Sequence, residues 1–420
     1  MTAINPRWTR RAGVLIAVAG VLAVAGCTST PTGQPAPAPT SADGGGDLSD
    51  LQPLHLIIGE LSPQAGSGGQ SMDAFLAYLE ENSDGKITGE INYAGALLPV
   101  AQAPEGIGAG VAQAGNIAVN VTPDLLPVAQ ILPGQGYYHS ASYPHGILGT
   151  TAAATESFLT NADLLAELEA KNLVPLAANN AAQSYDLLCN ANTPVASLSD
   201  AAGKRTRQAG AAWVGELEAI GMVPTQVQVA DLYDTFQKGG VDCSAAAVNT
   251  VKAWGILDFA TQYTPAVLSS SPSNVLVVNK QVWDGLPEAG KQLFRDAGKE
   301  WFKVKTMAVL QELVNFATVD AEEFGITLNK APDLNAKLRE YQDATYGAVS
   351  GDYPGVADPQ SIADGYRAAV DEWEAFIADD LGVPESFADE ADTIADVFPD
   401  SVTDAQIAQL ADALYAKIYG

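Results

Sequence analysis

The feature that most restricts the fold of this chain is the alternation of short apolar runs with helical stretches after residue 50. Residues 54–58 have the composition of a buried strand, and residues 71–82 place their apolar side chains on one helical face. Residues 87–93 then alternate as a second strand. The rhythm recurs with strands at 117–119 and 173–176 and a helix at 162–171. Such alternation predicts an α/β fold with parallel sheets.

A second unit with the same pattern begins near residue 179. Strands are expected at 185–189, 223–229 and from 241, with helices at 210–220 and 231–238. After residue 252 the chain becomes more helical, chiefly at 290–318 and 335–346. We therefore predict two α/β lobes wrapped by helices. Ligands of such folds bind at the carboxyl ends of the strands, which face each other across an interlobe cleft.

These patterns divide the chain into consecutive regions. The expected regions are lobe I at 51–177, lobe II at 178–263, return strands to lobe I and lobe-spanning helices at 264–350, and a C-terminal helical extension at 351–420. Apolar side chains at helical spacing predict helices at 363–381 and 404–419. We expect these helices to pack on the body, and a dimer contact or docking surface is the alternative.

The N-terminal segment has the pattern of an export signal. Arg7, Arg10 and Arg11 precede an apolar stretch at 13–26 that is short for a membrane span. Small residues before Cys27 resemble the lipobox of bacterial lipoproteins, in which the cysteine is acylated. The resemblance implies a signal peptide at 1–26, a lipidated Cys27 with a flexible linker to residue 50, and an extracytoplasmic protein anchored by lipid. A cleaved secretory signal or an uncleaved anchor is the alternative.

The other two cysteines are expected to form a disulfide. If Cys27 is acylated, Cys189 and Cys243 remain in an oxidising compartment. A catalytic thiol is the alternative, but neither cysteine has a histidine nearby in the sequence.

Charge makes nucleic acid an unlikely partner. The chain has 50 acidic and 21 basic residues, a formal net charge of −29, and an excess of this sign repels phosphate backbones. Solubility is the simplest reason for the excess. Basic residues are sparse, and the densest group is Lys204-Arg205-Thr206-Arg207.

Motifs of the common enzyme classes do not occur. The sequence has no G-x-S-x-G elbow, P-loop, dinucleotide glycine fingerprint or metal-ligand spacing. His55, His139 and His145 are scattered and are expected to be structural. We therefore predict a non-enzyme without cofactor or metal, while a hydrolase with a dispersed site stays open as the less favoured alternative.

Residues 54–301 resemble the extracytoplasmic solute-binding proteins of tripartite ATP-independent periplasmic (TRAP) transporters. The best-matching segments are Thr193-Pro194, Leu198-Ser199-Asp200, Gly203-Lys204-Arg205-Thr206-Arg207, 229–237 and Gly240-Val241-Asp242. Their order and spacing match the family's G-x-K-x-R segment and the helix and strand that follow it. The resemblance implies a two-lobed periplasmic-binding-protein-like fold of type II, here with additional C-terminal helices.

The resemblance also implies a function and partners. Proteins of this family capture a small carboxylate-containing solute in the cleft and deliver it to the membrane subunits of the transporter. The alternative from another class is a two-lobed lipoprotein that senses a solute for a signalling receptor.

Arg207 matches the family arginine that binds the substrate carboxylate through two parallel hydrogen bonds. A planar guanidinium offers paired donors to the two carboxylate oxygens, which lysine cannot do. The alternative is a surface arginine in a solvated turn beside Lys204 and Arg205.

Two departures from the family pattern indicate an unusual ligand. Asp186 stands near the place of a second family arginine, and the family's Asn-Pro step is replaced at Ala246-Ala247. If Asp186 faces the cleft beside Arg207, an amine-bearing or zwitterionic ligand would complement both charges. An alignment shift of one or two residues would instead put Asp186 on the outside.

Further candidate ligand-binding residues rest on their position alone. Glu60 and Ser62 follow the first strand, and Asn120 and Thr122 follow the strand at 117–119. An ordinary capping or loop role is the alternative for each of them. Tyr185 and Trp213 are candidates for an aromatic wall, and a core position is the alternative for Trp213.

Overall fold

The computed structural model describes residues 48–420, except 181–184, 209–210, 271 and 352. The predicted signal peptide at 1–26, the predicted lipidation site Cys27 and most of the predicted linker lie outside the described residues. Within the described part, no helix combines the length and the apolar character needed to cross a membrane.

The first sheet forms the core of lobe I and has five strands in the order β2-β1-β3-β11-β5. The strands are β1 (Leu54–Gly59), β2 (Ile87–Asn92), β3 (Ala114–Ala118), β5 (Leu173–Asn180) and β11 (Pro272–Asn279). Helix α1 (Ser67–Asn82) connects β1 to β2, and α2 (Ala103–Gly108) lies between β2 and β3. The apolar face predicted for α1 is buried, with Met72, Phe75 and Leu79 fully inaccessible.

The second sheet forms lobe II and has six strands in the order β12-β10-β6-β9-β7-β8. The strands are β6 (Tyr185–Cys189), β7 (Arg205–Gln208), β8 (Val223–Gln226), β9 (Cys243–Ala246), β10 (Gln262–Leu268) and β12 (Thr327–Leu328). Helices α5 (Leu198–Ala201), α6 (Ala211–Ala219) and α7 (Val229–Gln237) connect its strands. Strand β5 belongs to the first sheet up to Asn180, and β10 belongs to the second sheet up to Leu268. The bounds 178–263 expected for lobe II stay a prediction.

Parallel sheets were expected, but both sheets are mixed. Strand β11 runs antiparallel to β3 and β5, and β6 runs antiparallel to β9 and β10. Parallel neighbours need a long crossover, usually a helix. Strands β5 and β6, and likewise β10 and β11, follow each other in the chain but belong to different sheets, so the chain crosses between the sheets at these points. The strands of the parallel pairs β1–β2 and β7–β8 are each joined by one helix, α1 and α6 respectively.

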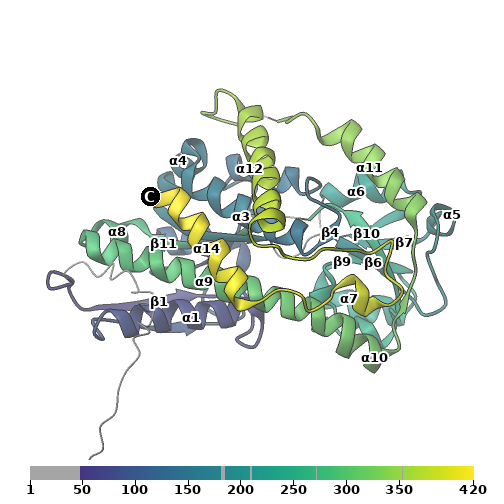
Figure 1. Ribbon diagram of the computed structural model, residues 1–420, viewed down its shortest axis with the longest axis horizontal. Helices are drawn as coiled ribbons and strands as arrows, with labels where there is room; N and C mark the ends of the chain where they lie inside the picture. Colours follow the sequence, from purple (N-terminus) through teal and green to yellow (C-terminus); the bar gives the residue numbers. More distant parts are fainter. Residues whose placement is uncertain (1–47, 181–184, 209–210, 271, 352) are drawn as a thin grey trace, which may run out of the picture. The chain divides into compact units, whose positions relative to one another are not determined.

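Helix α9 (Glu288–Asn315) is the longest helix of the described chain. It packs on α1, β5 and α14, and its Phe294, Trp301 and Phe302 are fully buried. In Figure 1, α9 extends from the neighbourhood of α1 and β11 toward that of α7 and α10 (Ala321–Phe324). Helix α8 (Lys280–Asp284) precedes it.

Helix α3 (His145–Thr160) was not predicted. Thirteen of its sixteen residues are buried, among them Gly146, Thr150 and Ala153. A helix buried on nearly all sides has no polar face, so the apolar periodicity that identifies a surface helix is missing. It is followed by α4 (Ala162–Ala170), which was predicted.

The C-terminal extension packs on the body. Helix α12 (Pro359–Asp379) contacts α3, and α14 (Asp404–Tyr419) contacts α9 and α3, as Figure 1 shows. Between them, β13 (Ser386–Phe387) pairs with β4 (Ser142–Tyr143), and α13 (Ile394–Val397) follows. Helix α11 (Pro332–Tyr346) precedes the extension and contacts α6 and β10.

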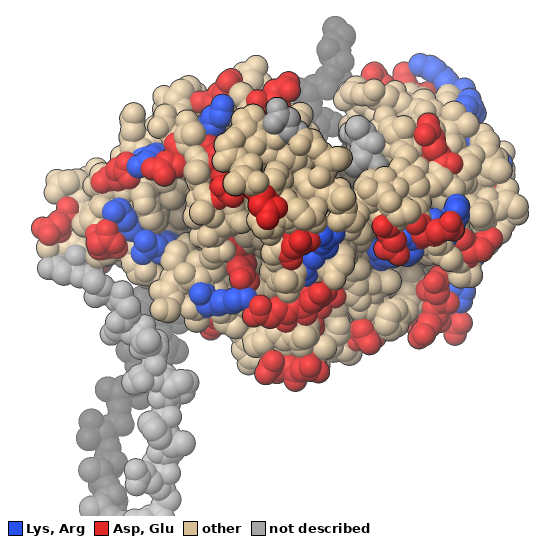
Figure 2. Space-filling view, turned by 90° about the horizontal axis from the view of Figure 1, so that it is seen from above, with Lys and Arg blue, Asp and Glu red and all other residues tan. Residues whose placement is uncertain are grey.

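Acidic side chains are distributed over the surface. Figure 2 shows Asp and Glu side chains across the whole viewed face, with Lys and Arg side chains interspersed among them. The large negative net charge is therefore not confined to one patch on this face.

Candidate functional site

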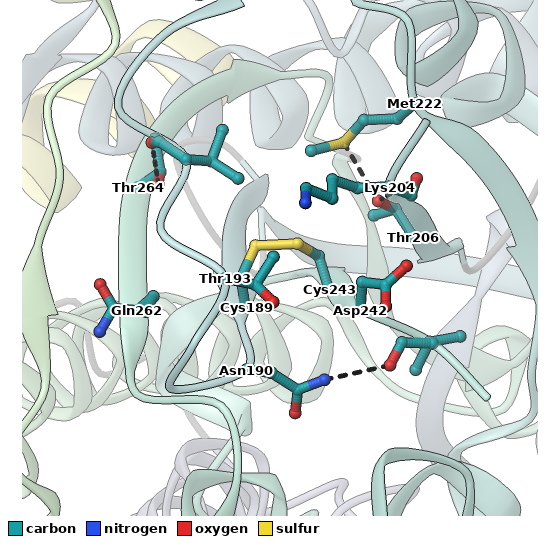
Figure 3. The surroundings of a disulfide bond; sticks show 12 residues. Cys189, Asn190, Thr193, Lys204, Thr206, Met222, Asp242, Cys243, Gln262 and Thr264 are labelled. Carbon is teal, nitrogen blue, oxygen red and sulfur yellow. Dashed lines mark hydrogen bonds between the residues drawn. A yellow bond between two sulfur atoms is a disulfide. The ribbon is translucent and has the colours of Figure 1, made fainter. Parts of the chain in front are cut away.

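The predicted disulfide between Cys189 and Cys243 is confirmed. The two residues are register partners on β6 and β9, and their sulfur atoms are bonded at 2.00 Å (Figure 3). Thr206 of β7 is in turn the register partner of Cys243. The bridge thus holds β6 and β9 together beside the strand that carries Arg207.

Arg207 lies on β7 opposite Ser244 and is only 4% exposed. Its Nε donates a hydrogen bond to the carbonyl oxygen of Val227 (3.2 Å), and Nη1 donates to that of Ala245 (3.4 Å). Both acceptors are neutral, and no carboxylate of the described residues forms an ion pair with this guanidinium. Burial lowers the pKa of Arg207, while Tyr185 acts in the opposite direction. A buried cation without an acidic partner can bind an anion.

Trp254 orients this guanidinium. The Arg207 guanidinium carbon lies 5.1 Å from the centroid of the Trp254 ring, a cation–π distance. Stacking on one face leaves the edge of the guanidinium to form in-plane hydrogen bonds. The sequence did not identify Trp254, because it lies between the short helices η5 (Val248–Thr250) and η6 (Ile256–Asp258), where no strand or helix pattern places it.

Tyr185 and Trp213 contact each other. Their ring centroids are 4.7 Å apart, and the Trp213 Nε1 donates to the carbonyl oxygen of Ser269 at 2.8 Å. Trp213 is 6% exposed and packs in a core cluster with Leu217, which agrees with the alternative that it is a core residue. Burial raises the pKa of Tyr185, and the positive charge of Arg207 counteracts this. Tyr185 therefore lies within electrostatic reach of Arg207.

Glu60 follows β1 and is 1% exposed. Its Oε1 accepts a hydrogen bond from the Ser62 backbone N–H (2.8 Å), and its Oε2 accepts one from Asn116 Nδ2 (3.1 Å). A Cβ atom at Gly68 would stand 2.6 Å from Glu60 Oε1, so only glycine permits this approach. Ser62 thus positions Glu60 through its backbone.

Lys305 of α9 lies within electrostatic reach of the Glu60 carboxylate. It is 7% exposed and its Nζ donates to Ser67 Oγ at 3.0 Å. Burial lowers the pKa of Lys305, and the negative charges of Glu60 and Glu312 act in the opposite direction. The sequence pattern assigned Lys305 only to a long helix and did not indicate this contact.

Glu312 connects the two lobes. Its Oε1 accepts a hydrogen bond from the Ser67 backbone N–H at the start of α1, in lobe I (2.9 Å). Its Oε2 accepts one from Asn249 Nδ2 in η5, which follows β9 of lobe II (2.9 Å). Such a contact between segments far apart in the chain has no signal in a single sequence.

The side chains of Asn120 and Thr122 differ in exposure. Asn120 is exposed, whereas Thr122 is 4% exposed and donates from Oγ1 to the carbonyl oxygen of Val119 (3.2 Å). The Thr122 contact agrees with the alternative of an ordinary capping residue. Ligand contact by either residue stays a prediction.

Asp186 is buried, with 3% exposure. Its Oδ1 accepts a hydrogen bond from the Ala266 backbone N–H (2.9 Å), and its Oδ2 accepts one from the Tyr263 hydroxyl (3.0 Å). Asp186 lines a cavity together with Tyr263 and Ala266, but Arg207 does not line that cavity. An amine-binding role beside Arg207 stays a prediction, and the two hydrogen bonds tie Asp186 on β6 to the neighbouring strand β10.

Five buried amide oxygens have no hydrogen-bond partner among the described residues, and three of these five lie on strands. These three are Asn116 Oδ1 on β3, Asn179 Oδ1 near the end of β5 and Gln208 Oε1 at the end of β7. A buried acceptor without a donor is costly, and binding sites are a common reason for one. A bound molecule with hydroxyl or N–H groups could supply the missing donors.

A sequence model of the family described as bacterial extracellular solute-binding protein, family 7, matches residues 59–336. Among solved structures, a Bordetella pertussis extracytoplasmic solute receptor that binds pyroglutamic acid superposes with a TM-score of 0.59 at 20% identity, covering 74% of this chain and 99% of that one.

Two further structures show the same likeness. The periplasmic ectoine-binding protein of a TRAP transporter from Halomonas elongata has a TM-score of 0.58 at 17% identity, covering 76% of this chain and 99% of its own. A TRAP periplasmic solute-binding protein from Sulfitobacter sp. NAS-14.1, with bound β-D-galacturonate, has a TM-score of 0.54 at 16% identity, covering 75% and 99%. At such identities the likeness establishes the fold alone.

Proposed function

Because the chain belongs to the bacterial extracellular solute-binding proteins of family 7, we propose that it captures a small carboxylate-containing solute between its two lobes, with Arg207 binding the carboxylate. The observation that supports this best is the burial of the Arg207 guanidinium against two carbonyl oxygens and one indole ring. A carboxylate there would form charge-assisted, paired hydrogen bonds that the neutral carbonyls do not provide.

The chemistry of the neighbours' ligands agrees with this proposal. Galacturonate, pyroglutamic acid and ectoine, the molecules named for three solved structures of the same fold, each carry a carboxylate. Each also carries hydroxyl or N–H groups, the kind of donor that a buried acceptor such as Asn116 Oδ1 lacks. We therefore expect a solute with one carboxylate and several hydrogen-bond donors.

Solute capture by a two-lobed protein requires relative motion of the lobes. Glu312 accepts one hydrogen bond from each lobe, so this contact is expected to differ between open and closed states.

The closed form would then be recognised by TRAP transporter membrane subunits, with Cys27 as the lipid anchor outside the cytoplasm. Uptake of labelled solute into vesicles that hold those subunits tests delivery, and uptake that does not depend on this chain would contradict it.

The direct test is calorimetry of the full chain with matched pairs of acids and neutral analogues. D-galacturonate is compared with D-galactose, and pyroglutamate with its amide. We expect the acid to bind in at least one pair, its neutral analogue to bind at least tenfold more weakly, and the solute to be recovered unchanged. Equal affinity for acid and analogue, turnover of the solute, or no binding by a panel of organic and sugar acids would overturn the proposal.

A further inference from the structure

We propose a second binding site, for a small uncharged apolar molecule, in a cavity of about 340 Å³ between lobe II and the C-terminal extension. The cavity is separate from the proposed solute site, because neither Arg207 nor Trp254 lines it. Its volume is about twice that of an apolar cavity of ~150 Å³ that binds benzene, and it reaches the lower range of small-molecule pockets.

The walls of the cavity come from distant parts of the chain. The body contributes Tyr143, Val248, Tyr263 and Leu313, which are all buried. The C-terminal extension contributes Phe387, Val397 and Phe398. Apolar and aromatic side chains therefore surround most of the space, which favours an apolar occupant.

The C-terminal wall is held in place by specific contacts. Strand β13 pairs with β4, so that Ser386 is the register partner of Tyr143. The rings of Tyr143 and Phe398 pack edge to face with centroids 5.2 Å apart. Lys330 Nζ also donates to the carbonyl oxygen of Ala391 at 2.9 Å. The cavity is thus bounded by ordered chain on the side of the extension.

Three polar side chains of the lining, Asn335, Arg339 and Asp186, have partners inside the protein, while Asp389 is exposed. Asn335 accepts a hydrogen bond from the Val267 N–H and donates one to the carbonyl oxygen of Pro265, both at 3.2 Å. Arg339 donates from Nη1 to the carbonyl oxygen of Tyr137 (2.7 Å), and Asp186 accepts from Tyr263 and Ala266. A polar ligand would have to displace these bonds, whereas an apolar ligand leaves them intact.

The site depends on the C-terminal extension of this chain. The family match ends at residue 336, and Phe387, Val397 and Phe398 all lie beyond it. The matched part of the chain therefore cannot form this wall.

Toluene titration of the full chain tests the proposal, with Cys27→Ser introduced to remove the predicted acylation site. We expect saturable binding in calorimetry and a rise in the midpoint of thermal unfolding. Ala388, partly buried in the lining, is replaced by phenylalanine to fill the cavity. Ala388→Phe should weaken toluene binding at least tenfold, whereas the matched variant Ala405→Phe, at an exposed position of α14, should leave it unchanged.

Three outcomes would overturn the proposal. They are no saturable binding of toluene, unchanged binding in Ala388→Phe, and tighter binding of benzoate than of toluene at this cavity, which would assign an anionic ligand to Arg339. If Ala388→Phe does not fold, Ala336→Phe on the α11 side of the lining serves the same purpose with the same expected loss.

Discussion

Arg205 and Arg207 are separated by one residue on β7, yet their surroundings are opposite. Arg205 is exposed and donates from Nε and Nη2 to the two carboxylate oxygens of Asp242, at 3.0 and 2.7 Å. Arg207 is buried and donates only to carbonyl oxygens. Residues two apart on a strand point to the same face of the sheet, so the pleat does not explain the difference in exposure between the two arginines. The difference arises from the parts of the protein that cover this face at each end of β7. Of these two arginines, Arg207 is the one without a carboxylate partner among the described residues.

Replacement of Arg207 by lysine should weaken solute binding. The variant keeps the charge but loses the paired donors, so we expect a loss of about 1.5–3 kcal/mol of binding free energy, or roughly 10- to 150-fold in Kd. Arg205→Lys is the matched control and should change Kd by less than about twofold, because an exposed ion pair contributes little. Calorimetry on both variants with the best-binding acid checks this. Similar losses in the two variants would contradict the assignment.

Reduction of the Cys189–Cys243 bridge should destabilise lobe II. The bridge closes a loop with a sequence separation of 54, for which we expect about 2–4 kcal/mol of the unfolding free energy. Urea unfolding with and without dithiothreitol measures the difference. The double variant Cys189→Ser/Cys243→Ser should show the same loss and no further response to the reductant. Identical midpoints for oxidised and reduced wild type would refute this expectation.

Local patterns explain which features could be predicted. Helix α14 was expected at residues 404–419 and lies at Asp404–Tyr419, since its apolar spacing and polar face are both visible in the sequence. The disulfide followed from the compartment and the cysteine count, and the family resemblance is confirmed by the match over residues 59–336. Apolar spacing, the cysteine count and the family motifs can all be read directly from the sequence.

Features that depend on distant contacts could not be predicted. The contact of Glu312 with Ser67 and Asn249 joins segments 245 and 63 residues apart. The ring of Trp254 reaches Arg207 only because the chain folds back after β9. The hydrogen bonds of Asp186 to β10 likewise depend on an antiparallel pairing that the alternation pattern did not indicate.

His139 should make the protein less stable as the pH falls below about 6.5. Burial, followed by the nearby positive charge of Arg339, lowers the pKa of His139 from 6.5 to about 3. Its Nδ1 donates to the carbonyl oxygen of Ser140 at 2.7 Å, and its buried Nε2 has no partner among the described residues. Between pH 6.5 and about pH 3 the unfolded chain therefore holds a proton on His139 that the folded chain does not hold. The contribution of neutral His139 to the unfolding free energy is complete above pH 6.5 and is lost as the pH falls.

The His139→Gln variant isolates this effect from other titrating groups. Between pH 7 and pH 5 the wild type should lose about 2 kcal/mol of unfolding free energy more than the variant does. Urea unfolding of both proteins at the two pH values gives the comparison. Parallel pH dependences would show that His139 takes up its proton in the folded protein as readily as in the unfolded chain.

Asp186→Asn should reduce stability more than solute affinity. The carboxylate accepts hydrogen bonds from the Ala266 N–H and the Tyr263 hydroxyl, and an amide has only one acceptor oxygen for these two donors. One buried donor then loses its partner, at a cost of about 1–3 kcal/mol in unfolding free energy. Because Asp186 lines the cavity beside β10 and Arg207 does not, we expect the Kd values of galacturonate and ectoine to change by less than about threefold, or ~0.7 kcal/mol. A selective loss of at least tenfold for ectoine, whose ring carries a positive charge, would instead establish Asp186 as a cation partner in the solute site.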